Sequence, residues 1–221
     1  MTSAGNDIVS LNAINSNRTK QSWFYSHILS STEEAIYEKP EIAALPFEYF
    51  VWLLWTIKES AYKYLQRIKP DLIFSPTKFI VQELQIPSGF IVTNFEGSKT
   101  EDTGFENNST IIKGIINVGP DTIFSRSIIY KELITSVVNG DENFENICWG
   151  IKLINKSDAQ YQSTAVRQLL ITRLQRLLRN DNLAIGKSPH GFPILLEGGN
   201  ETTIPVSISH HDRLVAYSFQ S

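Results

Sequence analysis

The sequence has few cysteines and few charged residues. Cys148 is the single cysteine among 221 residues, so the chain cannot form an internal disulfide, and its place beside Trp149 is typical of a buried small hydrophobe. Charged residues make up 19% of the chain and the net charge is −3, which argues against a general nucleic-acid binder. The single cysteine fits a reduced, cytoplasmic setting.

Long hydrophobic stretches are lacking as well. The strongest apolar run, residues 50–55, is far too short to span a bilayer. The first seven residues carry neither a basic region nor a long apolar stretch, so we expect no secretion signal and no membrane partner. Apolar residues still make up 42% of the chain, which is enough for a folded core in one large domain or two small lobes.

Several common catalytic signatures are also missing. The sequence has no Walker loop, no His-Glu-x-x-His helix, no paired-cysteine motif and no Gly-x-Ser-x-Gly elbow. The chemistry must therefore be sought in other residue patterns.

A helix expected over residues 46–65 is the most informative segment. One side carries an ordinary core stripe of Phe50, Leu54, Ile57, Ala61 and Leu65. The opposite side carries Trp52, Trp55, Glu59 and Lys63. Because a solvated face rarely carries two tryptophans, we expect this helix to be covered on both sides, with the two charged residues facing a cleft or a second layer. The alternative is an ordinary Glu–Lys pair on the surface.

The remaining elements follow from the hydrophobic period and the turn residues. We expect helices over residues 16–38 and 163–178. Polar stretches at residues 96–109 and 186–193 are predicted to be loops. The predicted strands cover residues 5–11, 77–84, 89–95, 111–118, 123–133, 149–154, 194–196, 204–210 and 214–219.

The order of elements in the first part of the chain is echoed in the second. Residues 5–12 resemble residues 150–155, and each segment precedes a helix, a proline loop and closing strands. The echo predicts an α+β fold of two pseudo-twofold-related α/β lobes. The predicted lobes are residues 1–145 and 146–221, with a cleft where they meet.

Asp7 on the first strand, with Glu59 and Lys63 on the helix, makes a plausible phosphoryl-transfer set. Two carboxylates can hold Mg²⁺ against a diphosphate, and a lysine can neutralise charge on a leaving phosphate. Spacing alone leaves open whether Asp7 reaches Glu59, and the Asn6-Asp7 pair could also be part of a turn.

Three motifs resemble those of the 4'-phosphopantetheinyl transferases. They are Gly5-Asn6-Asp7-Ile8-Val9, Trp55-Thr56-Ile57-Lys58-Glu59-Ser60-Ala61-Tyr62-Lys63 and Val206-Ser207-Ile208-Ser209-His210. Their order resembles the holo-acyl-carrier-protein synthase type, whereas the length resembles the larger two-lobed type, in which the Ser-His motif comes first. The resemblance implies a permuted two-lobed member and the 4'-phosphopantetheinyl transferase fold.

The resemblance also implies an activity, which is transfer of 4'-phosphopantetheine from coenzyme A to a serine of an apo acyl or peptidyl carrier protein. Asp7 and Glu59 would bind Mg²⁺ with the diphosphate of coenzyme A. Glu59, or a water held by it and the metal, would take the serine proton, and Lys63 would stabilise the departing adenosine 3',5'-bisphosphate. The implied substrate-binding residues are Lys58, Lys187, Ser209 and His210. His211 competes with His210, because successive residues of a strand point in opposite directions. Such a chain would serve fatty acid or polyketide biosynthesis.

The chain departs from the family pattern at two places. Val9 and Ser10 stand where many members have a second acid. Residues 64–70 stand where many members have a glycine-rich turn, which leaves Arg67 and Lys69 as candidates for phosphate contacts.

Other interpretations stay open, namely a non-catalytic member that binds carrier proteins or coenzyme A, and an unrelated metal-dependent phosphotransferase. If the two lobes complete one cleft, the protein should be a monomer. Because carrier proteins are acidic, we expect docking on basic surface, either beside Arg18 or on the predicted helix face of Arg173, Arg176 and Arg179.

Overall fold

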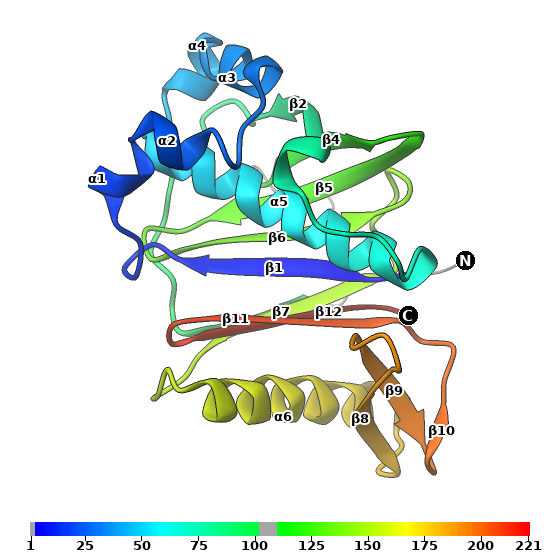
Figure 1. Cartoon of the computed structure of the whole chain (residues 1–221). Coiled ribbons are helices and arrows are strands. Elements are labelled where there is room, and N and C mark those ends of the chain that lie inside the picture. The colour runs from blue at the N-terminus through cyan, green and yellow to red at the C-terminus, as the bar shows by residue number, and fades with distance from the viewer. Residues whose placement is uncertain (1–2, 102–109) are drawn as a thin grey trace.

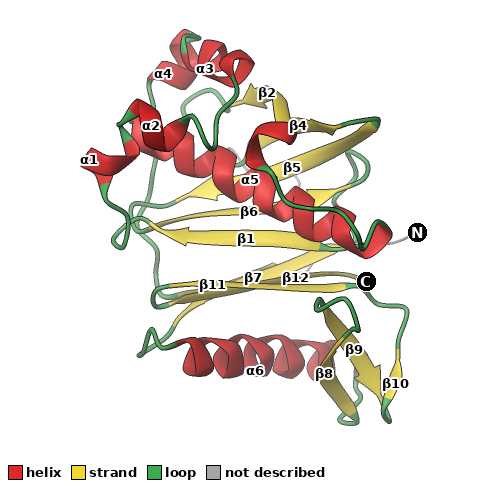
Figure 2. Ribbon diagram, viewed as in Figure 1, coloured by secondary structure: helices red, strands yellow, loops and turns green. Residues whose placement is uncertain are grey.

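Two antiparallel sheets, each flanked by a long helix, occupy the centre of the computed structural model (Figures 1 and 2). The structure describes residues 3–101 and 110–221. The mixture of helices and strands confirms the α+β class.

The first sheet has five strands in the order β1-β6-β5-β4-β2. Helix α5 (Phe47–Ile68) packs across one face of this sheet, and four short helices and a 3₁₀ turn surround α5. The strands are β1 (Gly5–Ser10), β2 (Ile80–Gln85), β4 (Ile112–Val118), β5 (Asp121–Ile129) and β6 (Leu133–Asn139). The short helical elements are α1 (Ser16–Thr19), α2 (Ser22–Tyr25), α3 (Ser31–Tyr37), α4 (Pro40–Ala43) and η1 (Pro76–Lys78).

The second sheet has four strands in the order β11-β12-β7-β3, and helix α6 (Ala159–Leu178) covers its outer face. A small three-stranded sheet, β10-β9-β8, lies beyond the end of α6. These strands are β3 (Ser98–Glu101), β7 (Ile147–Leu153), β8 (Leu183–Lys187), β9 (Pro193–Glu197), β10 (Asn200–Glu201), β11 (Val206–His211) and β12 (Leu214–Gln220).

The strand pairing repeats between the two sheets. β1 pairs antiparallel with β6, and β7 pairs antiparallel with β12, while α5 and α6 each follow the first strand of their set. β3, from the first part of the chain, nevertheless pairs with β7. The division into lobes at residue 145 stays a prediction.

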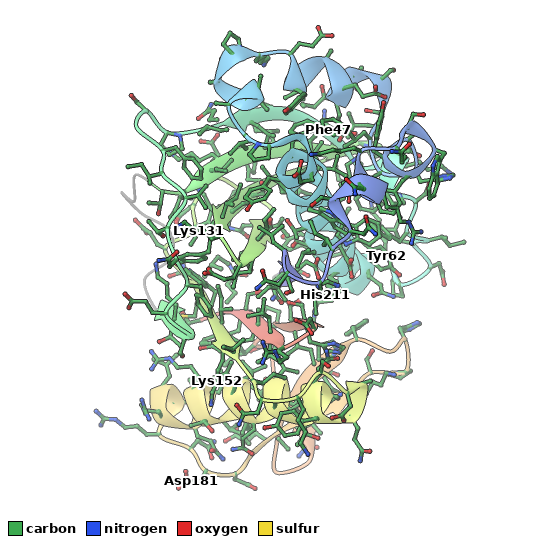
Figure 3. The ribbon with its side chains drawn as sticks, turned by 90° about the vertical axis from the view of Figure 1, so that its left-hand side faces the viewer. Phe47, Tyr62, Lys131, Lys152, Asp181 and His211 are labelled. Carbon is green, nitrogen blue, oxygen red and sulfur yellow. The ribbon has the colours of Figure 1, made fainter. Side chains whose placement is uncertain are left out.

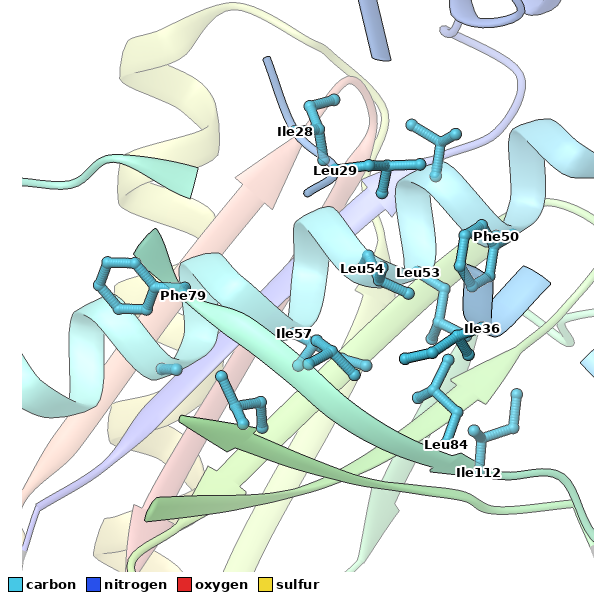
Figure 4. Packing of buried hydrophobic residues seen from close by; sticks show 14 of the residues in the cluster. Ile28, Leu29, Ile36, Phe50, Leu53, Leu54, Ile57, Phe79, Leu84 and Ile112 are labelled. Atoms are coloured by element: carbon cyan, nitrogen blue, oxygen red, sulfur yellow. The ribbon is translucent and has the colours of Figure 1, made fainter. Parts of the chain in front are cut away.

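The larger groups of buried apolar side chains hold these layers together. The largest lies between α5 and the five-stranded sheet, where Phe50, Leu53, Leu54 and Ile57 are completely buried (Figure 4). Each such side chain contributes about 1.5–3 kcal/mol. A second group, including Ile8 and Trp149, joins the two sheets. A third packs α6 on the second sheet and contains Cys148, which is buried as expected.

Helix α5 is covered on both sides, as its two tryptophans predict. Trp52 donates a hydrogen bond from Nε1 to Thr19 Oγ1 at 3.1 Å. Trp55 packs on Phe74 with 5.7 Å between ring centroids. The far side of the helix is therefore covered by a second layer.

Several strand predictions are wrong, and β8 and β10 were not expected either. β6 was not expected, because all seven of its residues are buried and the alternation of polar and apolar residues disappears when both faces are covered. Residues 89–95 form no strand beyond a single bridge at Thr93. Ser98–Glu101, expected to be loop, forms the polar edge strand β3. The rest of that expected loop, residues 102–109, lies outside the described residues.

Among the helices of the described part of the chain, none has the length and apolar character that a membrane crossing requires.

Candidate functional site

A glycine lets α5 approach β1 closely. A Cβ added at Gly5 would stand 2.2 Å from the carbonyl oxygen of Ser60 and 2.9 Å from Tyr64. Such separations are far below van der Waals contact, so a side chain at this position would push the helix away. The glycine thereby brings Asp7, two residues along the strand, to the polar side of α5.

Asp7, Glu59 and Lys63 form one charged cluster. The Lys63 ammonium group lies 2.9 Å from Asp7 Oδ1 and 3.5 Å from Glu59 Oε1. It also donates a hydrogen bond to the carbonyl oxygen of Asn6 at 3.1 Å. Asp7 therefore does reach the helix, which spacing in the sequence left open.

The environment of this cluster alters its proton affinities. Burial raises the pKa of Asp7 to about 7, with Glu59 adding to the rise and Lys63 opposing it. Burial disfavours the charge of Lys63, but the two carboxylates outweigh burial and raise its pKa. Lys63 thus stays charged at neutral pH.

The cluster fits a cation. Two carboxylates from different elements converge on one positive charge, the Lys63 ammonium group, and carboxylate oxygens are the donors that Mg²⁺ prefers. Within residues 3–101 and 110–221, no group of three or more His, Cys, Asp and Glu side chains could hold a metal ion. A bound Mg²⁺ would therefore rely on Asp7 and Glu59 and complete its shell with water or substrate oxygens.

Strand β11 meets the free edge of β1 through its side chains. Ser209 Oγ accepts a hydrogen bond from Asn6 Nδ2 at 2.7 Å, and His211 Nδ1 accepts one from the backbone N–H of Ser10 at 2.9 Å. Figure 3 shows His211 in the middle of the molecule, between the layers of α5 and α6. Ser209 thus contacts Asn6, the residue next to Asp7, at the junction between the sheets.

His210 lies near the cluster and is exposed. Partial burial of its ring lowers the pKa of His210. The positive charges of Lys63 and His211 lower it further by smaller amounts, and Glu59 opposes the change. The ring is therefore mostly neutral at pH 7, and it lies within electrostatic reach of Glu59 and Lys63.

Lys58 points away from this cluster. Its ammonium group is completely buried, lies 2.7 Å from Glu33 Oε2 and donates to the carbonyl oxygen of Ile28 at 2.6 Å. A phosphate arriving from solvent cannot reach it. The phosphate contact predicted for Lys58 is therefore corrected to a structural ion pair.

The loop that follows Lys187 lies against the end of α5. The Arg67 guanidinium stacks on Phe192 at 4.7 Å and donates to the carbonyl oxygens of Pro193 and Val206. Arg67 therefore holds the loop and the start of β11, and Lys69 is paired with Asp121. Lys187 itself is exposed and remains a candidate for substrate contact.

The arginines proposed for docking have different surroundings. Arg18 stacks on Phe24 at 5.0 Å and on Trp23 at 5.5 Å, forming an exposed aromatic patch. Arg173 and Arg176 line, with Lys152, a hollow of about 600 Å³ between α6 and the end of β7. Each place carries arginine side chains, and docking of a carrier protein on either one stays a prediction.

Sequence reasoning missed the residues that join β11 to β1, namely Asn6, Ser10, Ser207 and Asp212. The alternation of polar residues in Ser207-Ile208-Ser209-His210-His211 was a signal that one face of this strand is polar. What that face contacts depends on the packing of the two sheets.

The comparisons with known proteins agree with the motifs. Residues 3–107 match the family model described as the 4'-phosphopantetheinyl transferase superfamily, and this range contains Asp7, Glu59 and Lys63. Neither a curated protein nor a solved structure matches the chain. The segment that brings these three residues together is thus similar to the 4'-phosphopantetheinyl transferase superfamily.

Proposed function

We propose that the protein transfers the 4'-phosphopantetheine group of coenzyme A to a serine of an apo acyl or peptidyl carrier protein. The observation that carries this proposal is the convergence of Asp7, Glu59 and Lys63, contributed by β1 and α5, inside the segment that matches the family. The likeness to the family supports phosphopantetheine transfer in general, and the charged cluster supports a phosphoryl-transfer step.

In the proposed reaction the serine oxygen forms a bond to the phosphorus that bears pantetheine. The bond from that phosphorus to the bridging oxygen breaks, and adenosine 3',5'-bisphosphate leaves. The half-buried Glu59 carboxylate is the acceptor for the serine proton. A Mg²⁺ ion held by Asp7 and Glu59 would neutralise negative charge on the diphosphate of coenzyme A.

Lys63 and His210 have supporting roles in this proposal. Lys63 remains charged between the two carboxylates, and its flexible stem lets the ammonium group turn toward a phosphate oxygen of the leaving group. His210 is exposed beside this charge and can donate to a phosphate, as can Lys187.

A binding protein of the same fold is the second candidate. Val9 and Ser10 stand in place of a further acid, and the described residues offer two carboxylates instead of three. Such a protein would bind coenzyme A or a carrier protein without transferring the group.

The test is incubation with coenzyme A, Mg²⁺ and a panel of apo carrier proteins, followed by mass spectrometry of the carriers. We expect one carrier to gain a phosphopantetheine group, and Glu59→Gln to lower the rate by about 10²-fold or more, since it removes both a metal ligand and the base. Glu34→Gln, on the exposed face of α3, is the matched control and should be fully active. Near-normal turnover in Glu59→Gln would sink the assignment, and coenzyme A binding without transfer would favour the second candidate.

A further inference from the structure

β1 is an edge strand, yet its free edge is occupied. It pairs with β6 on one side, and no strand of the described residues pairs along the other. Edge strands leave backbone N–H groups without partners, and these groups need a replacement when they are buried. The backbone N–H of Asn6 donates to Ser207 Oγ at 3.1 Å, and that of Ser10 donates to His211 Nδ1 at 2.9 Å.

The acceptors come from alternate residues of β11. Ser207, Ser209 and His211 share one face of that strand, and Ser209 Oγ accepts from the side chain of Asn6 at 2.7 Å. His210 faces the opposite way and is exposed. The two sheets are therefore joined at this point by side chains of one strand and the edge of the other.

The joint continues directly into the charged cluster. Asn6 is completely buried, and its carbonyl oxygen accepts from the Lys63 ammonium group at 3.1 Å. The next residue is Asp7, which binds the same ammonium group at 2.9 Å. A shift of the β1 edge would therefore move an acceptor of Lys63 and the Asp7 carboxylate together.

Ser10 anchors the other end of the strand. Its hydroxyl donates to Asp212 Oδ2 at 3.3 Å, next to the His211 contact. Because His211 Nδ1 accepts a hydrogen bond, the ring must be neutral with its proton on Nε2. Burial lowers the pKa of His211, which keeps the ring in that form, although Asp212 and Glu59 oppose the shift.

We propose that Ser207, Ser209 and His211 are positioning residues, which hold the free edge of β1 in the register that places Asp7 and Lys63 for reaction. The inference rests on the proposed transfer, because that is the reaction they would position. It assigns the two adjacent histidines separate tasks, with His211 acting on the strand and His210 left to face the ligand.

The test compares His211→Leu with His211→Asn. Asparagine can present an oxygen close to the place of Nδ1, whereas leucine has similar bulk without an acceptor. We expect His211→Leu to lower kcat about tenfold or more while the KM for coenzyme A changes less than about twofold, because misplacement of reacting groups costs turnover. His211→Asn should recover kcat to within about threefold of the wild type, since the acceptor is restored.

A second readout uses no catalysis. The amide resonance of Ser10 in a ¹⁵N-labelled free protein should move in His211→Leu and return toward its wild-type position in His211→Asn. His210→Leu changes the neighbouring residue on the opposite face and should leave that resonance in place. This measurement separates failure of the joint from failure of the proposed function, because it needs neither substrate.

Ser209→Ala is the further variant if His211→Leu does not fold. It removes the acceptor of Asn6 Nδ2 with a minimal change of shape and should lower kcat with little effect on the KM for coenzyme A. Equal kcat values in wild type, His211→Leu and Ser209→Ala would overturn the proposal. So would a His211→Asn variant as impaired as His211→Leu, because the acceptor would then be irrelevant.

Discussion

At Asp7, burial and pairing act on the carboxyl group in opposite directions. Burial is the larger influence and raises its pKa from 3.8 to about 7, in spite of the Lys63 ammonium group 2.9 Å away. The folded protein therefore retains a proton on Asp7 at pH values where the unfolded chain has lost it. A buried carboxyl group with a raised pKa lowers the stability of the folded protein at neutral pH. Such groups are common at functional sites, where side chains are arranged for binding or catalysis.

This proton predicts a pH-dependent stability. Between pH 4 and 7 the unfolded state binds fewer protons at Asp7 than the folded state, so the free energy of unfolding contributed by this residue falls as pH rises. The slope should be at most about 1.4 kcal/mol per pH unit. Urea unfolding of wild type and Asp7→Asn should be measured across this range. The difference between their free energies of unfolding should change with pH and level off above pH 7. Parallel curves for the two proteins would mean that Lys63 keeps Asp7 ionised throughout.

Helix α5 contributes to two separate ion-pair clusters, because its two sides pack on different layers. One side presents Glu59 and Lys63 to β1, and Lys58 is directed to the short helices on the other side. Glu33 at the start of α3 binds Lys58, and its other oxygen accepts from the backbone N–H of Val81 on β2 at 2.8 Å. The pair therefore fastens α3, α5 and β2 together away from the reacting groups.

Breaking this pair should cost stability. Lys58→Met leaves the Glu33 carboxylate buried without its countercharge, so we expect a loss of about 3–5 kcal/mol in the free energy of unfolding. Lys58→Met with Glu33→Gln removes both charges and should recover much of that loss. Lys20→Met, which breaks an exposed pair with Glu48, should cost less than about 1 kcal/mol.

The KM of Lys58→Met for coenzyme A distinguishes a structural role of Lys58 from a phosphate contact. Folded Lys58→Met should keep the wild-type KM for coenzyme A, because the ammonium group has no exposed surface. A large rise in that KM, measured below the unfolding temperature, would restore Lys58 to the substrate site.

At the scale of the molecule, both strands of the site belong to one chain. β1 carries Asp7, β11 carries the histidines, and His210 and His211 of this same chain lie within electrostatic reach of Glu59. A second copy is not needed to bring these groups together.

We therefore expect a monomer in solution. Light scattering coupled to gel filtration should give the mass of one chain across at least a tenfold range of concentration, with or without coenzyme A. A stable trimer in which His210 faces the Glu59 of another chain would reject the arrangement within one chain.

Much of the fold could be predicted where the signal is local. The helix around Glu59, its core stripe and its second covered side follow from a 3.6-residue period, because that pattern depends on the segment alone. β6 could not be predicted in this way, because it is buried on both faces and its residues do not alternate. The weak edge strand β3 depends on a partner, β7, about fifty residues away.

The sequence by itself identified Asp7, Glu59 and Lys63 as candidates, because their side chains carry the chemistry that the proposed reaction requires. Only the tertiary structure removed Lys58 from the candidate site and decided which of two histidines faces the strand. Lys58 and Lys63 share one helix, and His210 and His211 are adjacent, so their side chains differ mainly in direction. What each direction meets is set by layers that pack from distant parts of the chain, and no local pattern records it.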